Sequence, residues 1–304
     1  MKSKRKKKRM SPGLIATLAI CGVVVLCLAW MALTANTVKL MRATVTVEQL
    51  PPAFEGVKLL YVSDIDLMGN GSAARAGTLF KEMEALSPDM LILGGDYNAH
   101  SLPRILNRDT ALNAEDLRLR QSFFYSIKDF AAPLGKYALA APEDGEDLYG
   151  LLDECGFKLL NDSRHKLERG DDAMWLVGVN QNSQNIRKGG QLFRSGDCVI
   201  AVADSPDCFP ILNTVEAADG GRWVDLCLAG HTHGGQIMLL NRSLLTLSTL
   251  ERQYRYGWTR ETGVPMLTTS GLGCEGVGLR FRTQAEAWLI TLISPLPESS
   301  EQNP

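Results

Sequence analysis

A run of 20 residues without a charged side chain, from Leu14 to Leu33, constrains this 304-residue chain more than any other feature. About 20 apolar residues in a helix span the hydrocarbon core of a bilayer, so the run is long enough to cross a membrane. Residues 2 to 9 include seven Lys or Arg side chains, and positive charge before a first helix places the N-terminus in the cytoplasm. The rest of the chain is then expected outside the cytoplasm, with Trp30 at the outer interface.

A cleaved signal peptide is the competing interpretation of this run. The run is long for the apolar region of a signal peptide, and no clear A-x-A cleavage site follows it. We therefore favour an uncleaved single-pass anchor, with residues 1–11 as a basic cytoplasmic tail and 12–34 as the transmembrane helix. Residues 35–55 are expected to form a connector and 56–293 one folded domain. Residues 294–304 are rich in Pro, Ser and Glu and are expected to be a flexible tail.

The chain without its basic tail carries a net negative charge. Without its seven cationic side chains, 25 basic residues face 34 acidic ones, which leaves a net charge of about -9. Nucleic acids are bound by a surplus of Lys and Arg, so this balance argues against a nucleic-acid partner.

Seven cysteines are present, and five of them lie beyond the membrane run. The number five is odd and no C-x-x-C pair occurs, so we expect buried thiols rather than a disulfide framework. One disulfide outside the cytoplasm is left open as an alternative.

Short apolar strands alternate with amphipathic helices in the first half of the body and crowd together in the second half. Helices are expected at 71–87, 113–131 and 147–155. Strands are expected around Val45 and Val47, and at 57–62, 90–93, 136–140, 164–168, 173–179, 199–203, 225–229, 236–240, 265–269 and 286–293. This order predicts an α/β fold in which two sheets pack as a sandwich flanked by helices, preceded by the transmembrane helix.

Carboxylate and imidazole side chains follow four of these strands. A single Asp after a strand is usually a turn or a helix cap, and a single His pair is more often surface or core than ligand. Four such sites are harder to explain in this way, because strand ends are where α/β sheets bind ligands. Carboxylates with imidazoles suit a divalent cation. The candidate metal ligands are Asp64, Asp66, Asp96, Asp204, His231 and His233.

In order and spacing, these motifs resemble the calcineurin-like metallophosphoesterases, especially their membrane-associated bacterial branch. That family carries D-x-H, G-D, G-N-H-D, a lone His after a strand, and G-H-x-H. The resemblance spans residues 56 to about 293, and its fullest match is Gly230, His231 and His233. Gly95 and Asp96 match the second motif, and Asp64 begins the first.

The chain departs from the family at four positions. Asp66 stands where the first motif has His, and Asp204 stands where the lone His is found. Pro142 replaces the metal-binding Asn of G-N-H-D, and Glu143 replaces its catalytic His. Asp144 matches the last residue of that motif, which is often structural.

The resemblance implies one or two divalent ions that clamp a phosphate and activate a hydroxide between them. One ion would be held by Asp64, Asp66, Asp96 and His233, and a second would share Asp96 and use Asp204 and His231. Two exchanges of imidazole for carboxylate favour Mn among Mn, Mg, Fe and Zn. Glu143 could act as a general acid if its pKa were raised, or could instead become a ligand of the second ion.

The function implied is hydrolysis of a phosphomonoester or phosphodiester by a membrane-anchored, metal-dependent enzyme, with Asp96 and Glu143 as catalytic residues. The location suggests a lipid-linked or cell-envelope substrate. An alternative is a catalytically impaired member that binds metal, phosphate or a protein, which the loss of Asn and His in one motif favours. A third interpretation, an adhesive domain without metal, is disfavoured by the glycine-flanked His pair. Replacement by Asp and Glu rather than by small apolar residues favours catalysis.

Overall fold

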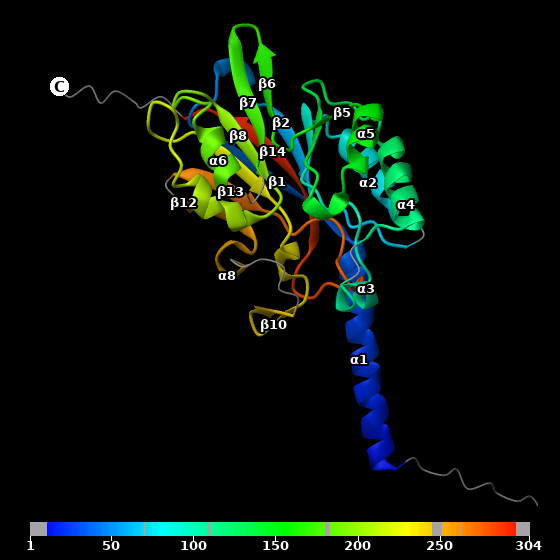
Figure 1. The fold of residues 1–304 in the computed structure, drawn as a ribbon. Coiled ribbons are helices and arrows are strands. Elements are labelled where there is room, and N and C mark those ends of the chain that lie inside the picture. Colours follow the sequence, from blue (N-terminus) through cyan, green and yellow to red (C-terminus); the bar gives the residue numbers. More distant parts are fainter. Residues whose placement is uncertain are drawn as a thin grey trace, which may run out of the picture.

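The computed structural model describes a long apolar helix that leads into a body of two sheets and their flanking helices (Figure 1). Its described residues are 11–69, 71–108, 111–179, 183–244, 251–261 and 263–295. The tail expected at 1–11 lies almost wholly outside these ranges, as do residues 296–304 of the expected C-terminal tail.

The first sheet has six strands in the order β1-β14-β2-β3-β4-β5. Its central strands β2 and β3 read KLLYV and MLIL, which are the continuous apolar runs of strands buried on both faces. β2 to β5 run parallel to one another, whereas β14 is antiparallel to β2 and parallel to β1. The strand bounds are β1 Val38–Thr46, β2 Lys58–Val62, β3 Met90–Leu93, β4 Lys136–Ala138, β5 Phe157–Leu159 and β14 Ala285–Ile293.

Helices cover the outer face of this sheet. The longest two bury apolar side chains at helical spacing, and the rings of Phe80 and Phe123 meet edge to face at 5.3 Å. Asn113 begins its helix in a capping box with Asp116, and Ile127 ends it because its backbone is no longer helical. The helices on this face are α2 Ser72–Glu84, α4 Ala114–Ser126 and α5 Asp147–Glu154, whereas α3 Leu102–Leu106 lies at the end of the body from which α1 projects (Figure 1). Two 3-10 turns are η1 Pro52–Phe54 and η2 Pro142–Asp144.

The second sheet has the order β12-β13-β9-β8-β7-β6. Its strands are β6 Arg164–Arg169, β7 Asp172–Val179, β8 Val199–Ala203, β9 Leu226–Ala229, β12 Gly257–Glu261 and β13 Val264–Thr268. The accompanying helices are α6 Ser183–Gly190, α7 Phe209–Leu212 and α8 Glu251–Tyr254, with turns η3 Pro206–Cys208 and η4 His233–Gly235. The predicted two-sheet α/β fold is therefore confirmed.

Two predicted segments differ from the structure. The strand predicted at 236–240 is reduced to β10 Met238–Leu239, which pairs with β11 Arg242–Ser243 outside both sheets. The chain reverses there because Leu240 and Asn241 both have positive φ, as in a two-residue hairpin loop of type I′. The short strand predicted near Val45 is longer than expected, because β1 pairs along its whole length with β14.

The inner faces of the two sheets share one apolar core. Side chains such as Tyr61, Ile92 and Ile290 from the first sheet meet Ile200 and Leu228 from the second, and all are buried. The five cysteines of the body are free and buried, which confirms the prediction of thiols used as apolar residues.

Truncation of Ile200 to Ala tests this core. Ile200 is fully buried between the sheets, so the variant loses packing and leaves a cavity. We expect the free energy of unfolding to fall by about 2–5 kcal/mol, measured by denaturant titration. Leu192→Ala is the matched control, because Leu192 is 57% exposed and its truncation should change stability little.

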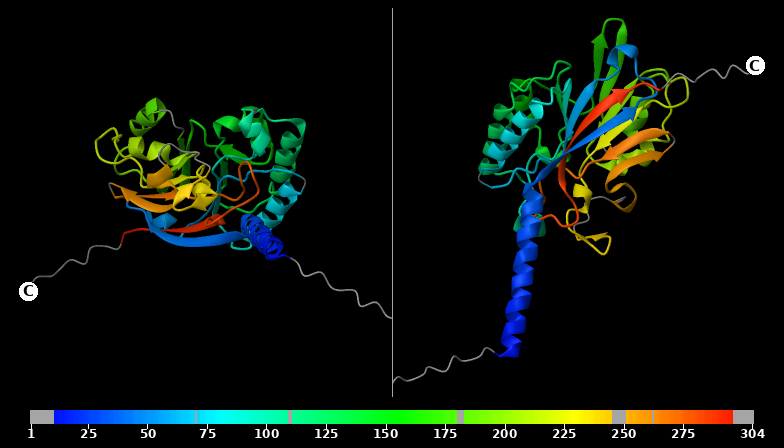
Figure 2. Two further views of the ribbon diagram at one scale, coloured as in Figure 1. Left: turned by 90° about the horizontal axis from the view of Figure 1, so that it is seen from below. Right: turned by 180° about the vertical axis from the view of Figure 1, so that it is seen from behind.

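The helix α1, Pro12–Asn36, projects from the body and leads almost directly into β1 (Figures 1 and 2). An 18-residue stretch of this 25-residue helix has a mean hydropathy of 2.6 and lies mostly exposed, so by length and composition the helix could cross a membrane. The helix contacts the body only near its C-terminal end within the described residues. There the Arg280 N–H donates to the Met31 carbonyl at 3.2 Å, and the Gln284 amide donates to the Thr37 carbonyl at 2.6 Å.

Candidate metal centre

The six predicted ligands follow the central strands of both sheets. Asp64 and Asp66 follow β2 and Asp96 follows the neighbouring β3, while Asp204 follows β8 and the two histidines follow its neighbour β9. β2 and β3 are parallel, as are β8 and β9, so each pair ends at one edge of its sheet. Because the sheets pack face to face, these two edges bring the six side chains together.

Three of the ligands form an outer group. One ligand atom from each of Asp96, Asp204 and His231 lies within 4.8 Å of the others. The Nδ1 atom of His231 is 3.4 Å from Oδ2 of Asp96. The His231 side chain is 21% exposed and that of Asp96 is 10% exposed, so this group has access to solvent. Two carboxylates and one imidazole at this spacing can share one cation.

The remaining three ligands form an inner group. Nδ1 of His233 lies 3.4 Å from Oδ2 of Asp66, and Nε2 of the same ring lies 4.0 Å from Oδ1 of Asp64. All three side chains are at most 3% exposed. The two ring nitrogens thus face different carboxylates. The ligand atoms of the inner group therefore converge less closely on one position than those of the outer group.

Hydrogen bonds join the two groups. The backbone N–H of His231 donates to Oδ1 of Asp64 at 2.6 Å, and the backbone N–H of Asp66 donates to the Asp96 carbonyl at 3.1 Å. The hydroxyl of Ser63 donates to the other oxygen of Asp64. These contacts fix the orientation of the Asp64 carboxylate, as the supporting groups of a metal site do.

The backbone is held in an unusual conformation at five of the six positions. Positive φ values occur at Asp64 (49°), Asp66 (50°), Asp96 (56°), His231 (71°) and His233 (49°). This left-handed region is sparsely populated by residues with a side chain and costs on the order of 1–3 kcal/mol each. Such conformations persist where the surrounding structure enforces them, and they concentrate at functional sites.

Burial opposes the charged forms of Asp66 and His233 in the inner group. Desolvation, with the nearby charge of Asp64 second, holds the pKa of Asp66 well above its usual range. Desolvation also lowers the pKa of His233 to about 4, so its ring is neutral at neutral pH. A neutral imidazole is the form that binds metal, and a bound cation would favour the ionised form of Asp66.

The donor set fits a divalent cation. Oδ2 of Asp66 and Nδ1 of His233 are buried and have no hydrogen-bond partner among the described residues. Leaving such groups without a partner is costly, and a cation would satisfy both. Four carboxylates with two imidazoles suit a divalent ion of intermediate hardness.

Arg280 is a supporting residue outside the six predicted ligands. Its side chain is fully buried, and its guanidinium donates to the carbonyl oxygens of Ser270, Gly271, Gly273 and His233. It therefore binds the loop after β13 to the His233 turn. Gly271 and Gly273 of that loop, next to the end of β13, are the sequence signal that could have identified the loop as part of the site.

Gly230 packs directly against the Asp64 carboxylate. A Cβ atom at this position would overlap Oδ2 of Asp64 and Oγ of Ser63. We expect Gly230→Ala to displace Asp64 and to weaken Mn binding by about 10–100-fold, the range for changes in groups that support metal ligands. Isothermal titration of the chelated protein with Mn measures this. Gly150→Ala is the control, because a Cβ on Gly150 meets nothing within 4 Å, and equal affinities in both variants would contradict the expectation.

The segment that departs most from the family forms the turn η2. Pro142 is exposed and has no side-chain oxygen, and the side chain of Glu143 lies outside the described part of the structure. Asp144 is buried, and its carboxylate accepts from the backbone N–H groups of Tyr97 at 3.0 Å and Ala141 at 2.8 Å. Asp144 therefore holds this turn against the loop after β3.

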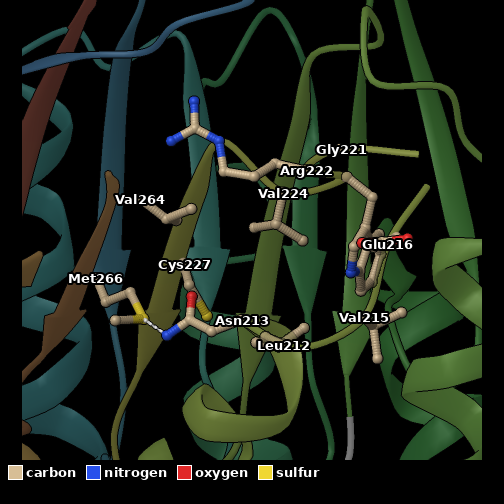
Figure 3. A pocket seen from close by; sticks show the side chains of 11 residues that line it. Leu212, Asn213, Val215, Glu216, Gly221, Arg222, Val224, Cys227, Val264 and Met266 are labelled. Carbon is tan, nitrogen blue, oxygen red and sulfur yellow. Dashed lines mark hydrogen bonds between the residues drawn. The ribbon is translucent and has the colours of Figure 1, made fainter. Parts of the chain in front are cut away.

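A separate cavity of about 210 Å³ lies on the outer side of the second sheet (Figure 3). It is lined by residues of α7, β9 and β13, among them Leu212, Cys227 and Met266. The Asn213 amide points across it to the sulfur of Met266 at 4.0 Å. None of the six predicted ligands lines this cavity, so it is not part of the candidate centre.

No protein-family profile matches the chain. Among curated proteins, a transmembrane protein with a metallophosphoesterase domain from Danio rerio is 23% identical over 90% of this chain and 62% of its own length. The chain thus spans less than two thirds of that relative. The uncharacterized metallophosphoesterase YkuE from Bacillus subtilis is 24% identical over 83% of this chain and 84% of its own. An uncharacterized metallophosphoesterase from Aquifex aeolicus is 23% identical over 89% of this chain and 97% of its own length.

Among solved structures, a dimetal phosphatase from Danio rerio aligns with a TM-score of 0.40 and 8% sequence identity. The alignment covers 71% of this chain and 88% of that one.

Proposed function

We propose that this chain, which is similar to curated metallophosphoesterases, is a calcineurin-like metallophosphoesterase that acts as a membrane-anchored, metal-dependent hydrolase of a phosphomonoester or phosphodiester. The observation that supports this most is the meeting of six carboxylate and imidazole side chains at the facing strand ends of two sheets.

In this proposal, Asp64, Asp66, Asp96 and His233 hold one ion, and Asp96, Asp204 and His231 hold the other. Divalent cations in such a site supply Lewis-acid activation of a water molecule and neutralise charge on phosphate oxygens. Asp96 belongs to both sets, and its backbone carbonyl also accepts a hydrogen bond from the backbone N–H of Asp66. The more exposed outer group, with His231, is the side from which a phosphoester would enter. Mn is the favoured ion, with Mg, Fe and Zn as alternatives.

The chain itself positions these groups. Ser63 and the His231 backbone orient Asp64, Arg280 ties the His233 turn to the loop after β13, and Asp144 anchors the turn that carries Glu143. Glu143 is proposed to lie next to the substrate, either as a general acid for the leaving group or as a further oxygen ligand.

The proposed anchor is α1, whose 25 residues exceed the roughly 20 needed to cross a bilayer. The seven basic side chains before it favour a cytoplasmic N-terminus and a catalytic domain outside the cytoplasm. This location supports a lipid-linked or cell-envelope phosphoester as substrate.

The enzymatic proposal is tested with the purified full-length chain and bis-p-nitrophenyl phosphate. We expect turnover that requires added Mn and that stops when EDTA is added in excess. No turnover of this or of p-nitrophenyl phosphate with any of the four candidate ions would contradict catalysis.

A second candidate function is metal or phosphate binding without turnover. Pro142 favours it, because a proline cannot supply the ligand oxygen of the family's Asn. Restoring the motif with Pro142→Asn and Glu143→His separates the two. If the natural chain is catalytic, the restored variant should show no large gain in hydrolysis rate over it. If the natural chain is inactive and the restored variant hydrolyses the substrate, the second candidate function, binding without turnover, is supported.

A further inference from the structure

Exposed apolar side chains gather at one end of the body. Outside α1, eleven large hydrophobic side chains of the described residues are exposed, and seven of them lie on or beside α3 and the β10–β11 hairpin. Of the other four, three lie on α4 and α5 and are only 37–39% exposed, and the fourth is Leu192. A cluster of this kind marks an interaction surface, whereas single exposed residues do not. The seven are Leu102, Ile105, Leu106, Leu239, Leu240, Leu244 and Tyr256.

This end of the body is the one from which α1 leaves. Figure 1 shows α3 and the hairpin at the end of the body from which α1 projects, with α3 drawn over the helix and the hairpin to one side of it. One segment ties the three elements together. Leu102 donates to the Gly276 carbonyl at 2.9 Å, Arg280 donates to Met31 of α1 at 3.2 Å, and Met238 donates to Phe281 at 3.0 Å. The apolar side chains are therefore held in a fixed position relative to α1.

The hairpin presents its most exposed leucine in a strained conformation. Leu240 is 85% exposed and has a φ of 48°, which is uncommon for a bulky residue. A leucine at this exposed turn adds no packing to the folded body, and Asn or Gly would fit its positive-φ backbone better. A leucine at the tip is understandable if the tip enters an apolar environment.

Positive charge accompanies these leucines although the body as a whole is acidic. Arg108 and Arg242 are exposed, and residues 102–108 and 237–244 contain no acidic residue. Arg255 and Arg282 line a cavity of about 470 Å³ between the hairpin and Trp30 of α1. Leucines flanked by arginines, with an aromatic residue at the boundary, match the interfacial region of a bilayer with its phosphates.

We propose that α3 and the β10–β11 hairpin dock onto the bilayer that α1 spans, with their leucines in the interfacial region and their arginines at the lipid phosphates. The hairpin begins five residues after His233, and Ser243 donates to the Gly235 carbonyl at 2.9 Å. Docking would therefore hold the histidine turn of the metal centre at the membrane surface. The inference rests on the proposed anchoring but not on the proposed catalysis.

Tryptophan quenching by brominated lipid tests the docking. The full-length chain carrying Leu240→Trp or Leu106→Trp is inserted into vesicles of phosphatidylcholine and phosphatidylglycerol, with and without bromine on the acyl chains. Both variants should lose more emission in brominated vesicles than the natural chain, and should shift to the blue relative to detergent. Leu192→Trp is the matched control, because Leu192 is likewise exposed, at 57%, but lies beyond α6 on the outer side of the second sheet.

Each other result overturns the docking. If both variants quench no more than Leu192→Trp, the surface does not meet the bilayer. If Leu240→Trp shifts with protein concentration in detergent alone, the surface binds a second copy of the chain instead. A chain that fails to float with the vesicles overturns anchoring and docking together. None of these readouts involves phosphoester hydrolysis, so failure of the catalytic proposal is seen separately.

Discussion

Asp96→Asn is expected to lower Mn-dependent hydrolysis of bis-p-nitrophenyl phosphate by about 10³-fold, which corresponds to roughly 4 kcal/mol of activation free energy. Asp96 belongs to both proposed ligand sets, and Oδ2 of its carboxylate lies 3.4 Å from His231. The amide removes one negative charge and places a donor where an acceptor is needed, yet keeps the size of the side chain. The measurement is the initial rate at saturating Mn for variant and parent.

The control for this substitution is Asp153→Asn, an equivalent change at an exposed position on α5. It should leave the rate unchanged. An Asp96→Asn enzyme that keeps the parental rate and the parental Mn content would contradict the assignment of Asp96. A melting temperature close to that of the parent excludes misfolding as the cause of a lost rate.

Removal of metal is expected to lower the melting temperature by about 5–10 °C. Four carboxylates lie close together in a largely buried centre, and burial already raises the pKa of Asp66, so the folded centre is more stable with a cation. An ion that binds only the folded state at 100 times its Kd adds about 2.7 kcal/mol, and each kcal/mol shifts the midpoint of a domain of this size by about 2–4 °C.

Thermal melts after EDTA treatment, and after readdition of Mn, measure this effect. The double variant Asp96→Asn with His231→Ala provides the comparison, because it lacks side chains of the outer group and should gain much less from Mn. Identical midpoints for the natural chain with and without Mn would show that no ion binds the folded state with useful affinity.

The strand ends could be located from the sequence because short apolar runs are followed by polar residues. VKLLYV before Asp64, MLIL before Asp96 and DLCLA before His231 each predicted a buried strand, and β2, β3 and β9 lie there. Parallel neighbours end at a common edge, so the approach of these side chains was predictable in outline.

Other features depend on tertiary contacts that no local pattern encodes. The left-handed backbone at Asp64 and His233 follows from packing of loops, and the two nitrogens of His233 face different carboxylates for the same reason. β1 was expected to be a short strand around Val45 and Val47 within a connector, because the alternation of Val and Thr is confined to that stretch, but pairing with β14 extends it. The exposed apolar surface at α3 and Leu240 could not be predicted either, because the sequence does not show which leucines remain exposed.

The most direct test of the metal centre is a crystal of the protein soaked in Mn, with anomalous scattering data collected near the Mn absorption edge. The account predicts an anomalous peak at about 2.0–2.6 Å from oxygens of Asp96 and Asp204 and from a ring nitrogen of His231, with a second peak beside Asp64 and His233. A map from well-occupied soaks with no peak among these six side chains would contradict it.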